Sequence, residues 1–142
     1  MTLVFEKDYK LSEINSIASK ILEYTKEYDT IALSGSLGAG KTTLTHAIVQ
    51  LLHLEDKVSS PTFSIINQYK GNNILVYHSD WYRINDEEEA IAAGIEDMLE
   101  QPGLKIIEWW EKAEKLLPEH CLYISLEVLD DNYRRIKITT NQ

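Results

Sequence analysis

The sequence predicts a three-layer α/β domain with a mixed central sheet, partly parallel and partly antiparallel. Three observations support this prediction. Short apolar runs typical of buried strands alternate with segments whose apolar residues recur at helical spacing. Two stretches have the pattern of antiparallel hairpins. The chain has 142 residues and shows no repeat, low-complexity segment or linker, so we expect one domain over residues 1–142.

The first half of the chain is expected to contain two strand–helix units. Residues 3–5 predict a short strand, and residues 12–28 predict a helix with Ser12 as its N-cap, because apolar side chains recur every three or four positions. Residues 30–34 form an apolar run followed by glycine, which is typical of a buried parallel strand. A second helix is predicted over residues 41–53.

The second half is expected to contain two hairpins separated by a helix and a strand. The first hairpin covers residues 63–78, and Gly71 or Asn72 is expected to supply a positive φ at its turn. The remaining elements are an acidic helix, a core strand and a second hairpin that turns near residues 130–132; they are predicted over residues 86–98, 104–108 and 122–139.

Charge and cysteine content exclude several classes of protein. The formal net charge is −9, which argues against tight, unaided binding to nucleic acid, because such binding needs cations on the protein. Cys121 is the only cysteine and is predicted to be a buried strand residue, so no intrachain disulfide or cysteine metal cluster is possible. No apolar run approaches the roughly 18 residues that span a bilayer. The N-terminus lacks the pattern of a signal peptide, and we expect a cytoplasmic protein without membrane contact.

Residues 35–42 read GSLGAGKT, which fits the Walker A pattern of a P-loop. The motif follows a predicted strand and precedes a predicted helix, which is the context that a P-loop requires. Gly38, Ala39 and Gly40 let the backbone approach phosphate oxygens closely. Their amide groups and the positive end of the following helix then form an anion site. The sequence therefore predicts binding of a nucleoside triphosphate, and we expect hydrolysis of ATP.

The first residues of the helix after the loop supply side chains for the same site. Lys41 is expected to contact the β- and γ-phosphates, and the Thr42 hydroxyl is expected to contact Mg²⁺, which prefers oxygen ligands. Thr43 is expected to contact the α-phosphate. Asp80 and Glu108 each end a predicted strand, at the sheet edge where α/β proteins bind ligands. One of the two acids would support the metal and the other would polarise the attacking water; position alone leaves their roles open.

A polar loop over residues 59–63 has two interpretations. It is either a switch that reaches the γ-phosphate through Ser60 and Thr62, or a plain turn fixed by Pro61. His53 and His78 lack partnered ligands in the sequence, and we interpret both as structural residues.

Four motifs, taken in order, resemble the TsaE (YjeE) family. They are GSLGAGKTTL at residues 35–44, SPTF at 60–63, HSDWYR at 78–83 and IEW at 107–109. Their order and spacing and the small size of the chain are similar to those of the family, and the resemblance covers essentially the whole chain. The sequence departs from the family pattern at Ser36, where an acid is usual, and at Trp81 and Trp110.

The resemblance implies a P-loop NTPase-like fold and an ATPase required for threonylcarbamoyl modification of adenosine 37 in tRNA. Such a protein uses ATP/ADP and Mg²⁺, acts on the TsaB–TsaD complex, contacts tRNA only indirectly and is weak without its partners. The resemblance also implies that Thr42 and Glu108 hold magnesium, with Asp80 near the metal and the water. The residues expected at the nucleotide are Leu11, Ser12, Gly38, Ala39, Gly40, Lys41, Thr42, Thr43, Trp109 and Arg134.

Three other functions compete with this interpretation. A nucleotide or small-molecule kinase usually clamps two phosphate groups with several arginines, and this chain has only Arg83, Arg134 and Arg135. A GTP-dependent switch would read guanine through Asn-Lys-x-Asp, a run that the sequence lacks. An ATP-binding scaffold with little turnover also fits the motifs, because partners often complete a P-loop site.

Overall fold

The computed structural model describes residues 1–36, 38–53, 57–58, 66–71 and 73–141. The predicted loop over residues 59–63 lies outside the described residues. The elements in chain order are β1 (Thr2–Lys10), η1 (Leu11–Glu13), α1 (Ile14–Tyr24), β2 (Thr30–Gly35), α2 (Lys41–Leu51), β3 (Lys57–Val58), β4 (Ile66–Gly71), β5 (Ile74–Asp80), α3 (Glu87–Ala92), α4 (Ile95–Glu100), β6 (Leu104–Glu108), η2 (Trp110–Leu116), β7 (Leu122–Val128) and β8 (Tyr133–Thr140).

The described strands form one eight-stranded sheet in the order β1-β8-β7-β2-β6-β5-β4-β3. The four central strands, β7, β2, β6 and β5, run parallel to one another. Antiparallel pairs flank them on both sides: β8 and β1 beyond β7, and β4 and β3 beyond β5. The predicted mixed sheet is confirmed. β1 is longer than residues 3–5, because it pairs with β8 from Thr2 to Lys10.

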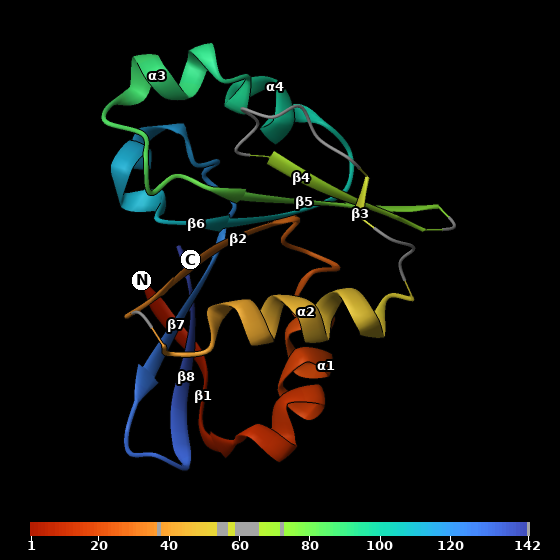
Figure 1. Cartoon of the computed structure of the whole chain (residues 1–142), viewed down its shortest axis with the longest axis vertical. Helices are drawn as coiled ribbons and strands as arrows, with labels where there is room; N and C mark the ends of the chain where they lie inside the picture. Colours follow the sequence, from red (N-terminus) through yellow and green to blue (C-terminus); the bar gives the residue numbers. More distant parts are fainter. Residues whose placement is uncertain (37, 54–56, 59–65, 72, 142) are drawn as a thin grey trace.

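Helices cover both faces of the sheet, which confirms the three layers (Figure 1). On one face, α1 and α2 pack against a core that includes Ile17, Ile21 and Ile48. On the other face, α3, α4 and η2 enclose a second core around Trp81, which is fully buried and donates its indole N–H to Ser79 Oγ at 2.9 Å. Each large apolar side chain buried in this way contributes about 1.5–3 kcal/mol to stability.

The start of the first helix differs from the prediction. Leu11–Glu13 forms a 3₁₀ turn, and the α-helix begins at Ile14. Ser12 is therefore not the N-cap, and the prediction was wrong at this position. The Glu13 carboxylate instead accepts a hydrogen bond from the Lys10 N–H at 3.0 Å and pairs with Lys7 at 3.4 Å. A carboxylate that takes the local amide donor leaves the serine hydroxyl without a capping role.

One further local feature was also predicted wrongly. The acidic segment over residues 86–98 is not one helix, because it breaks at Gly94 into α3 and α4. Asp86 caps α3 by accepting from the Glu89 N–H at 2.9 Å. In the β4–β5 turn Asn73 has a positive φ of 61° and Gly71 does not; Asn72, the other predicted position, lies outside the described residues, so that alternative stays a prediction. Asparagine tolerates this conformation better than most residues.

The topology brings the ends of the parallel strands to one edge of the sheet. Leu33 of β2 and Asp80 of β5 are both register partners of Glu108, the last residue of β6. The loop from β2 to α2 starts at this edge, so the fold places both acids beside the Walker A residues. β6 is buried along its whole length, because helices cover both of its faces.

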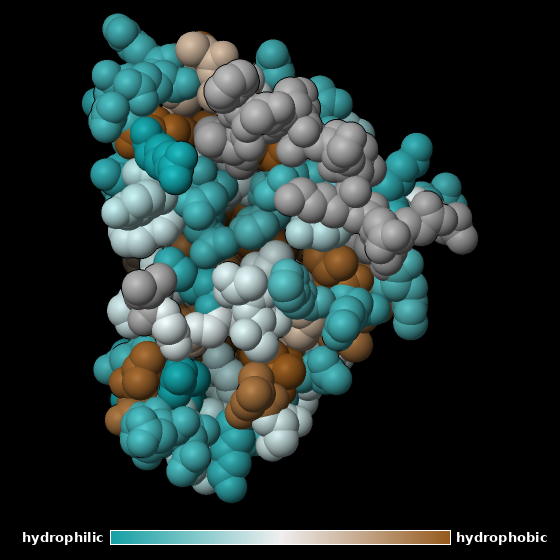
Figure 2. Space-filling model, in the orientation of Figure 1, coloured by the Kyte–Doolittle hydropathy of each residue, from teal (hydrophilic) through white to brown (hydrophobic). Residues whose placement is uncertain are grey.

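The outer surface is largely hydrophilic in the view of Figure 2, with hydrophobic patches in its lower part, where β1, α1 and the β7–β8 hairpin lie. The exposed large apolar side chains there include Leu11, Val128 and Leu129. Cys121, next to β7, is fully buried, as predicted. Across the described part of the chain, no helix combines the length and the apolar character needed to cross a membrane.

Candidate nucleotide site

The loop between β2 and α2 has the backbone that a phosphate cradle requires. Gly38 has a φ of 83° and Gly40 a φ of 102°, a left-handed region that costs other residues about 1–2 kcal/mol. Gly40 is the N-cap of α2 and provides no side chain, so the first amide groups of the helix have no side-chain cap. Free N–H groups at a helix start and the helix dipole together favour an anion.

A cavity of about 230 Å³ opens next to this loop. Its wall combines apolar groups from the start of the chain with polar groups from the β7–β8 turn. The lining residues are Tyr9, Leu11, Ile14, Gly38, Ala39, Gly40, Thr43, Asp131, Asn132 and Arg134. A larger, shallower hollow of about 510 Å³ lies near Ile74 and Gly103, beside the starts of the parallel strands and away from the phosphate loop.

Arg134 lies at the edge of the 230 Å³ cavity. Its Nη1 donates to the backbone oxygens of Asp130 at 2.8 Å and Tyr133 at 3.2 Å, and its Nη2 donates to the Gly38 oxygen at 3.4 Å. These bonds hold the guanidinium against the glycine-rich loop between β2 and α2. The neighbouring Arg135 points elsewhere, because it binds Asp8 at 2.7 Å.

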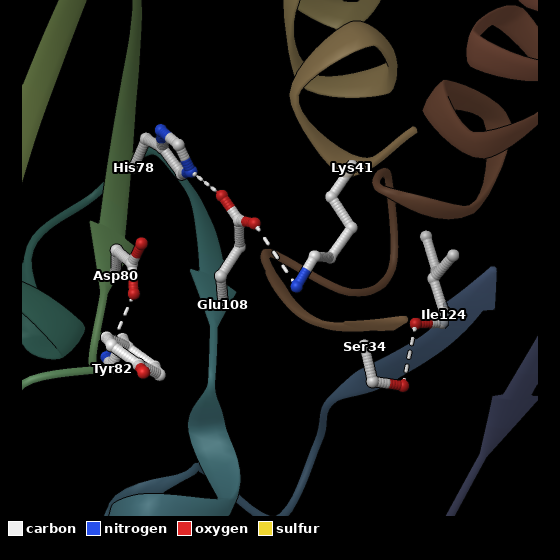
Figure 3. A network of polar contacts seen from close by, with 7 residues as sticks. All are labelled: Ser34, Lys41, His78, Asp80, Tyr82, Glu108 and Ile124. Atoms are coloured by element: carbon white, nitrogen blue, oxygen red, sulfur yellow. Dashed lines mark hydrogen bonds and ion pairs between the residues drawn. The ribbon is translucent and has the colours of Figure 1, made fainter. Parts of the chain in front are cut away.

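Lys41, Glu108 and His78 form one polar network at the sheet edge (Figure 3). Lys41 Nζ lies 3.9 Å from Glu108 Oε1, and His78 Nε2 lies 2.5 Å from Glu108 Oε2. All three side chains are mostly buried; that of Glu108 is 9% exposed. The carboxylate of Glu108 therefore has a cationic or hydrogen-bonding partner at each oxygen.

The surroundings keep Glu108 ionised. Burial raises the pKa of its carboxyl group, but the hydrogen bond to His78 and the charges of His78 and Lys41 outweigh burial. The net result is a pKa below the ordinary value of this side chain. An ionised carboxylate at the end of a strand is a suitable ligand for a hard cation such as Mg²⁺.

Trp109 follows Glu108 and packs against the lysine of the loop. It adopts a left-handed backbone conformation with a φ of 57°, which is unusual for a large residue and is stored strain of the kind found at functional sites. Lys41 Nζ lies 4.7 Å from the centre of its ring, within the range of a cation–π interaction. The Tyr82 ring also packs against Trp109, at 4.9 Å between centroids.

Asp80 lies beside Glu108 in the sheet but takes no part in the network. It is exposed, and its Oδ1 accepts a hydrogen bond from the Tyr82 N–H at 2.9 Å. Figure 3 shows its carboxylate in contact with Tyr82 and with no dashed line to Lys41. Both acids thus lie at the expected edge, and Glu108 alone of the two contacts the lysine.

The predicted hydroxyl residues lie on two elements: Thr42 and Thr43 on α2, and Ser12 on η1. Thr42 and Thr43 are exposed in the first turn of α2, and Thr43 lines the cavity. Leu11 also lines the cavity, whereas Ser12 does not. Among the described residues no three His, Cys, Asp or Glu side chains gather closely enough to hold a metal by themselves. Two carboxylates and a threonine hydroxyl fit a magnesium ion that takes its other ligands from phosphate and water.

Sequence reasoning missed several residues of the site. His78 was interpreted as structural, yet it contacts Glu108. A signal existed, because His78 and Asp80 are two positions apart on one strand and therefore share a face. Tyr9, Asp131 and Asn132 line the cavity through pairing of β1 with β8 and through the β7–β8 turn, contacts that have no local sequence pattern.

Comparisons with known proteins agree with this fold. Residues 9–136 match the family described as threonylcarbamoyl adenosine biosynthesis protein TsaE. A TsaE from Haemophilus influenzae is 36% identical over 108 residues, which are 76% of this chain and 68% of the relative. A TsaE from Bacillus subtilis is 35% identical over 89% of this chain and 79% of its own length. A crystal structure of Bacillus subtilis YdiB matches the whole chain and 89% of its own, with a TM-score of 0.71 and 26% identity.

The fold and the site define an α/β protein built around a Walker A strand–loop–helix unit. Within that class the family is clear from the extent of the match. The chain belongs to the TsaE family of threonylcarbamoyl adenosine biosynthesis proteins, as the motifs in its sequence predicted.

Proposed function

We propose that this chain is a Mg²⁺-dependent P-loop ATPase, a single domain over residues 1–142, that works in the threonylcarbamoyl modification of adenosine 37 in tRNA. Its substrate is ATP, and its partner is the cytoplasmic TsaB–TsaD complex. It contacts tRNA only through that complex, in keeping with its net charge of −9. Family membership supports the pathway, and the geometry of the site supports the chemistry.

The observation that supports ATP hydrolysis best is the contact between Lys41 and Glu108. Lys41 begins the helix after the phosphate loop, and Glu108 ends the neighbouring strand β6, 3.9 Å away. A phosphate group on the loop would replace Glu108 as the partner of the lysine. The carboxylate is then released next to the nucleotide, where an ionised acid is needed.

The roles of the other residues follow from their positions. Gly38, Ala39 and Gly40 present backbone amides to the phosphates, and Leu11 and Arg134 line the cavity that would take the nucleoside. Thr42 and Glu108 would hold the Mg²⁺ ion, which when bound neutralises charge on the phosphate oxygens.

Asp80 is the candidate for orienting the water. It is exposed and carries no cationic partner among the contacts described above, so its carboxylate is open to solvent beside Glu108. A positioned carboxylate that accepts a hydrogen bond from the attacking water is a common arrangement in phosphoryl transfer.

A kinase fits this site less well. Its second substrate would need cations near the loop, and Arg135 is already engaged by Asp8 at 2.7 Å and Glu6 at 3.6 Å. Arg134 is held against Gly38 at the nucleoside side of the loop. Arg83 is the remaining arginine of the sequence, and one arginine does not make a clamp.

The test is phosphate release from labelled ATP, measured for the chain alone and with TsaB and TsaD. We expect slow release alone and a clear increase with the partners. Glu108→Ala is expected to keep ATP binding and lose hydrolysis, whereas Glu111→Ala, a change of an exposed acid on η2, is the matched control. Transfer of label to an acceptor other than water, or normal turnover in Glu108→Ala, would contradict the proposal.

A further inference from the structure

We propose that His78 is a positioning residue for Glu108: it holds one carboxylate oxygen so that the other faces the phosphate loop when Lys41 leaves. This inference rests on the proposed function and assigns a role to a side chain that the sequence pattern suggested was structural. The geometry that supports it is the division of the two Glu108 oxygens between two partners.

The contact between His78 and Glu108 is built by the central sheet. His78 lies on β5 and Glu108 on β6, strands that pair in parallel with His78 opposite Ile106. The pleat places Ile106 and Glu108 on the same face of β6, so His78 reaches the acid two positions along. His78 Nε2 and Glu108 Oε2 are 2.5 Å apart, and the side chains are 17% and 9% exposed. Both side chains are thus largely buried and come from paired strands at the centre of the sheet.

The direction of the hydrogen bond follows from the chemistry of the two groups. An ionised carboxylate only accepts hydrogen bonds, so His78 must donate through Nε2–H. The opposite oxygen, Oε1, lies toward Lys41 Nζ at 3.9 Å, the longer and weaker of the two contacts. When the lysine turns to a phosphate, Oε1 loses its partner while Oε2 keeps its own.

The hydrogen bond to His78 therefore orients the Glu108 carboxylate before the nucleotide binds. A glutamate side chain without such a partner can rotate about three bonds and loses that freedom on binding. Residues that hydrogen-bond to a metal-binding side chain fix it in this way, and their removal typically lowers metal affinity or activity about 10- to 100-fold. His78 touches neither nucleotide nor water in this account and acts only through Glu108.

The test compares His78→Phe, which keeps a ring and removes the donor, with His78→Gln, whose amide N–H takes the place of Nε2–H. The matched control is His120→Phe, because His120 also makes a close ring contact, with Tyr28 at 4.2 Å, beside the start of β7 at the other end of the strands. Thermal unfolding, ATP affinity with EDTA, apparent Mg²⁺ affinity at saturating ATP, and kcat with TsaB and TsaD are measured for each protein.

We expect His78→Phe to lower the apparent Mg²⁺ affinity and kcat about 10- to 100-fold while metal-free ATP affinity stays within about threefold of wild type. His78→Gln is expected to recover most of both losses, and His120→Phe to show neither. If His78→Phe unfolds, His78→Asn takes its place as the variant without a donor, because the shorter asparagine cannot reach Glu108. His78→Asn is then expected to show the losses, and His78→Gln to recover most of both.

Three results would overturn the inference. Wild-type Mg²⁺ affinity and kcat in His78→Phe would exclude a positioning role. Equal losses in the Phe and Gln variants, together with a lowered unfolding temperature, would show a purely structural role. In nucleotide-free wild type, nitrogen-15 NMR is expected to find the His78 proton on Nε2, and a proton on Nδ1 alone would also contradict it. A wild type without Mg²⁺-dependent ATP binding would instead refute the proposed function itself.

Discussion

Replacing Lys41 with methionine removes the ammonium group from the phosphate loop and keeps an unbranched side chain of similar length. In the nucleotide-free chain that ammonium lies 3.9 Å from Glu108 Oε1 and 4.7 Å from the centre of the Trp109 ring. Its attraction to the carboxylate is about 4 kcal/mol at an effective dielectric constant of about 20, most of it offset by desolvation of two largely buried charges. The lysine is therefore held loosely enough to exchange one anion for another.

The expected loss of ATP affinity follows from that exchange. A hydrogen bond to a charged group contributes about 1.5–3 kcal/mol net, so Lys41→Met should weaken ATP binding by about 10- to 160-fold. Isothermal titration of ATP with Mg²⁺ measures this directly. Lys112→Met is the matched control. Lys112 also lies over an aromatic ring, 6.0 Å from the centre of the Tyr82 ring, but its side chain is exposed on η2 and is not part of the loop. Unchanged ATP affinity in a folded Lys41→Met protein would refute the assignment of the phosphate loop.

Three further predictions concern stability and reactivity. Folding lowers the pKa of Glu108 from 4.5, so the ionised carboxylate stabilises the folded chain above pH 4.5 and this stabilisation is lost as the pH falls through the folded pKa. Thermal melts at acid pH should show this loss in wild type and not in Glu108→Gln. An equal fall of the unfolding temperature with pH in both proteins would contradict it. Burial raises the pKa of Cys121 to about 12, so the native chain should resist iodoacetamide and the unfolded chain should react; rapid native labelling would contradict the buried position. Gly103→Ala should cost about 2 kcal/mol or more, because φ is 122° and a Cβ would lie 2.5 Å from the Leu75 oxygen. Gly94→Ala, with a φ of 85° and open space, should cost about 1–2 kcal/mol in the same thermal melts, and equal costs would contradict the close contact.

Much of the fold could be predicted because the relevant signals are local. The strand β2, the loop after it and α2 follow from an apolar run, three closely spaced glycines and helical spacing in adjacent segments. The strand β6 was predicted at its observed bounds, because Leu104, Ile106 and Ile107 form a short, mostly apolar segment typical of a strand in the centre of a sheet. The position of Glu108 followed from the end of that strand.

Other features were missed, since they depend on contacts between distant segments. Glu108 and His78 are 30 residues apart in the chain, and only the pairing of β5 with β6 brings them together. Tyr9 reaches the cavity because β1 pairs with β8, which lies at the other end of the sequence. The wrong N-cap at Ser12 has a local cause, because the Ser12 hydroxyl and the Glu13 carboxylate are both possible acceptors for a backbone N–H, and in the structure Glu13 accepts from Lys10.

In the proposed function, ATP hydrolysis by this chain sustains repeated rounds of tRNA modification by TsaB and TsaD. It is tested most directly by threonylcarbamoyl-adenosine formation on tRNA with purified partners and preformed threonylcarbamoyl-adenylate, so that only this chain requires ATP. We expect many turnovers with the chain and ATP, and at most about one with a non-hydrolysable analogue or with Lys41→Met. Equal product yields without the chain, or with the analogue in place of ATP, would contradict it.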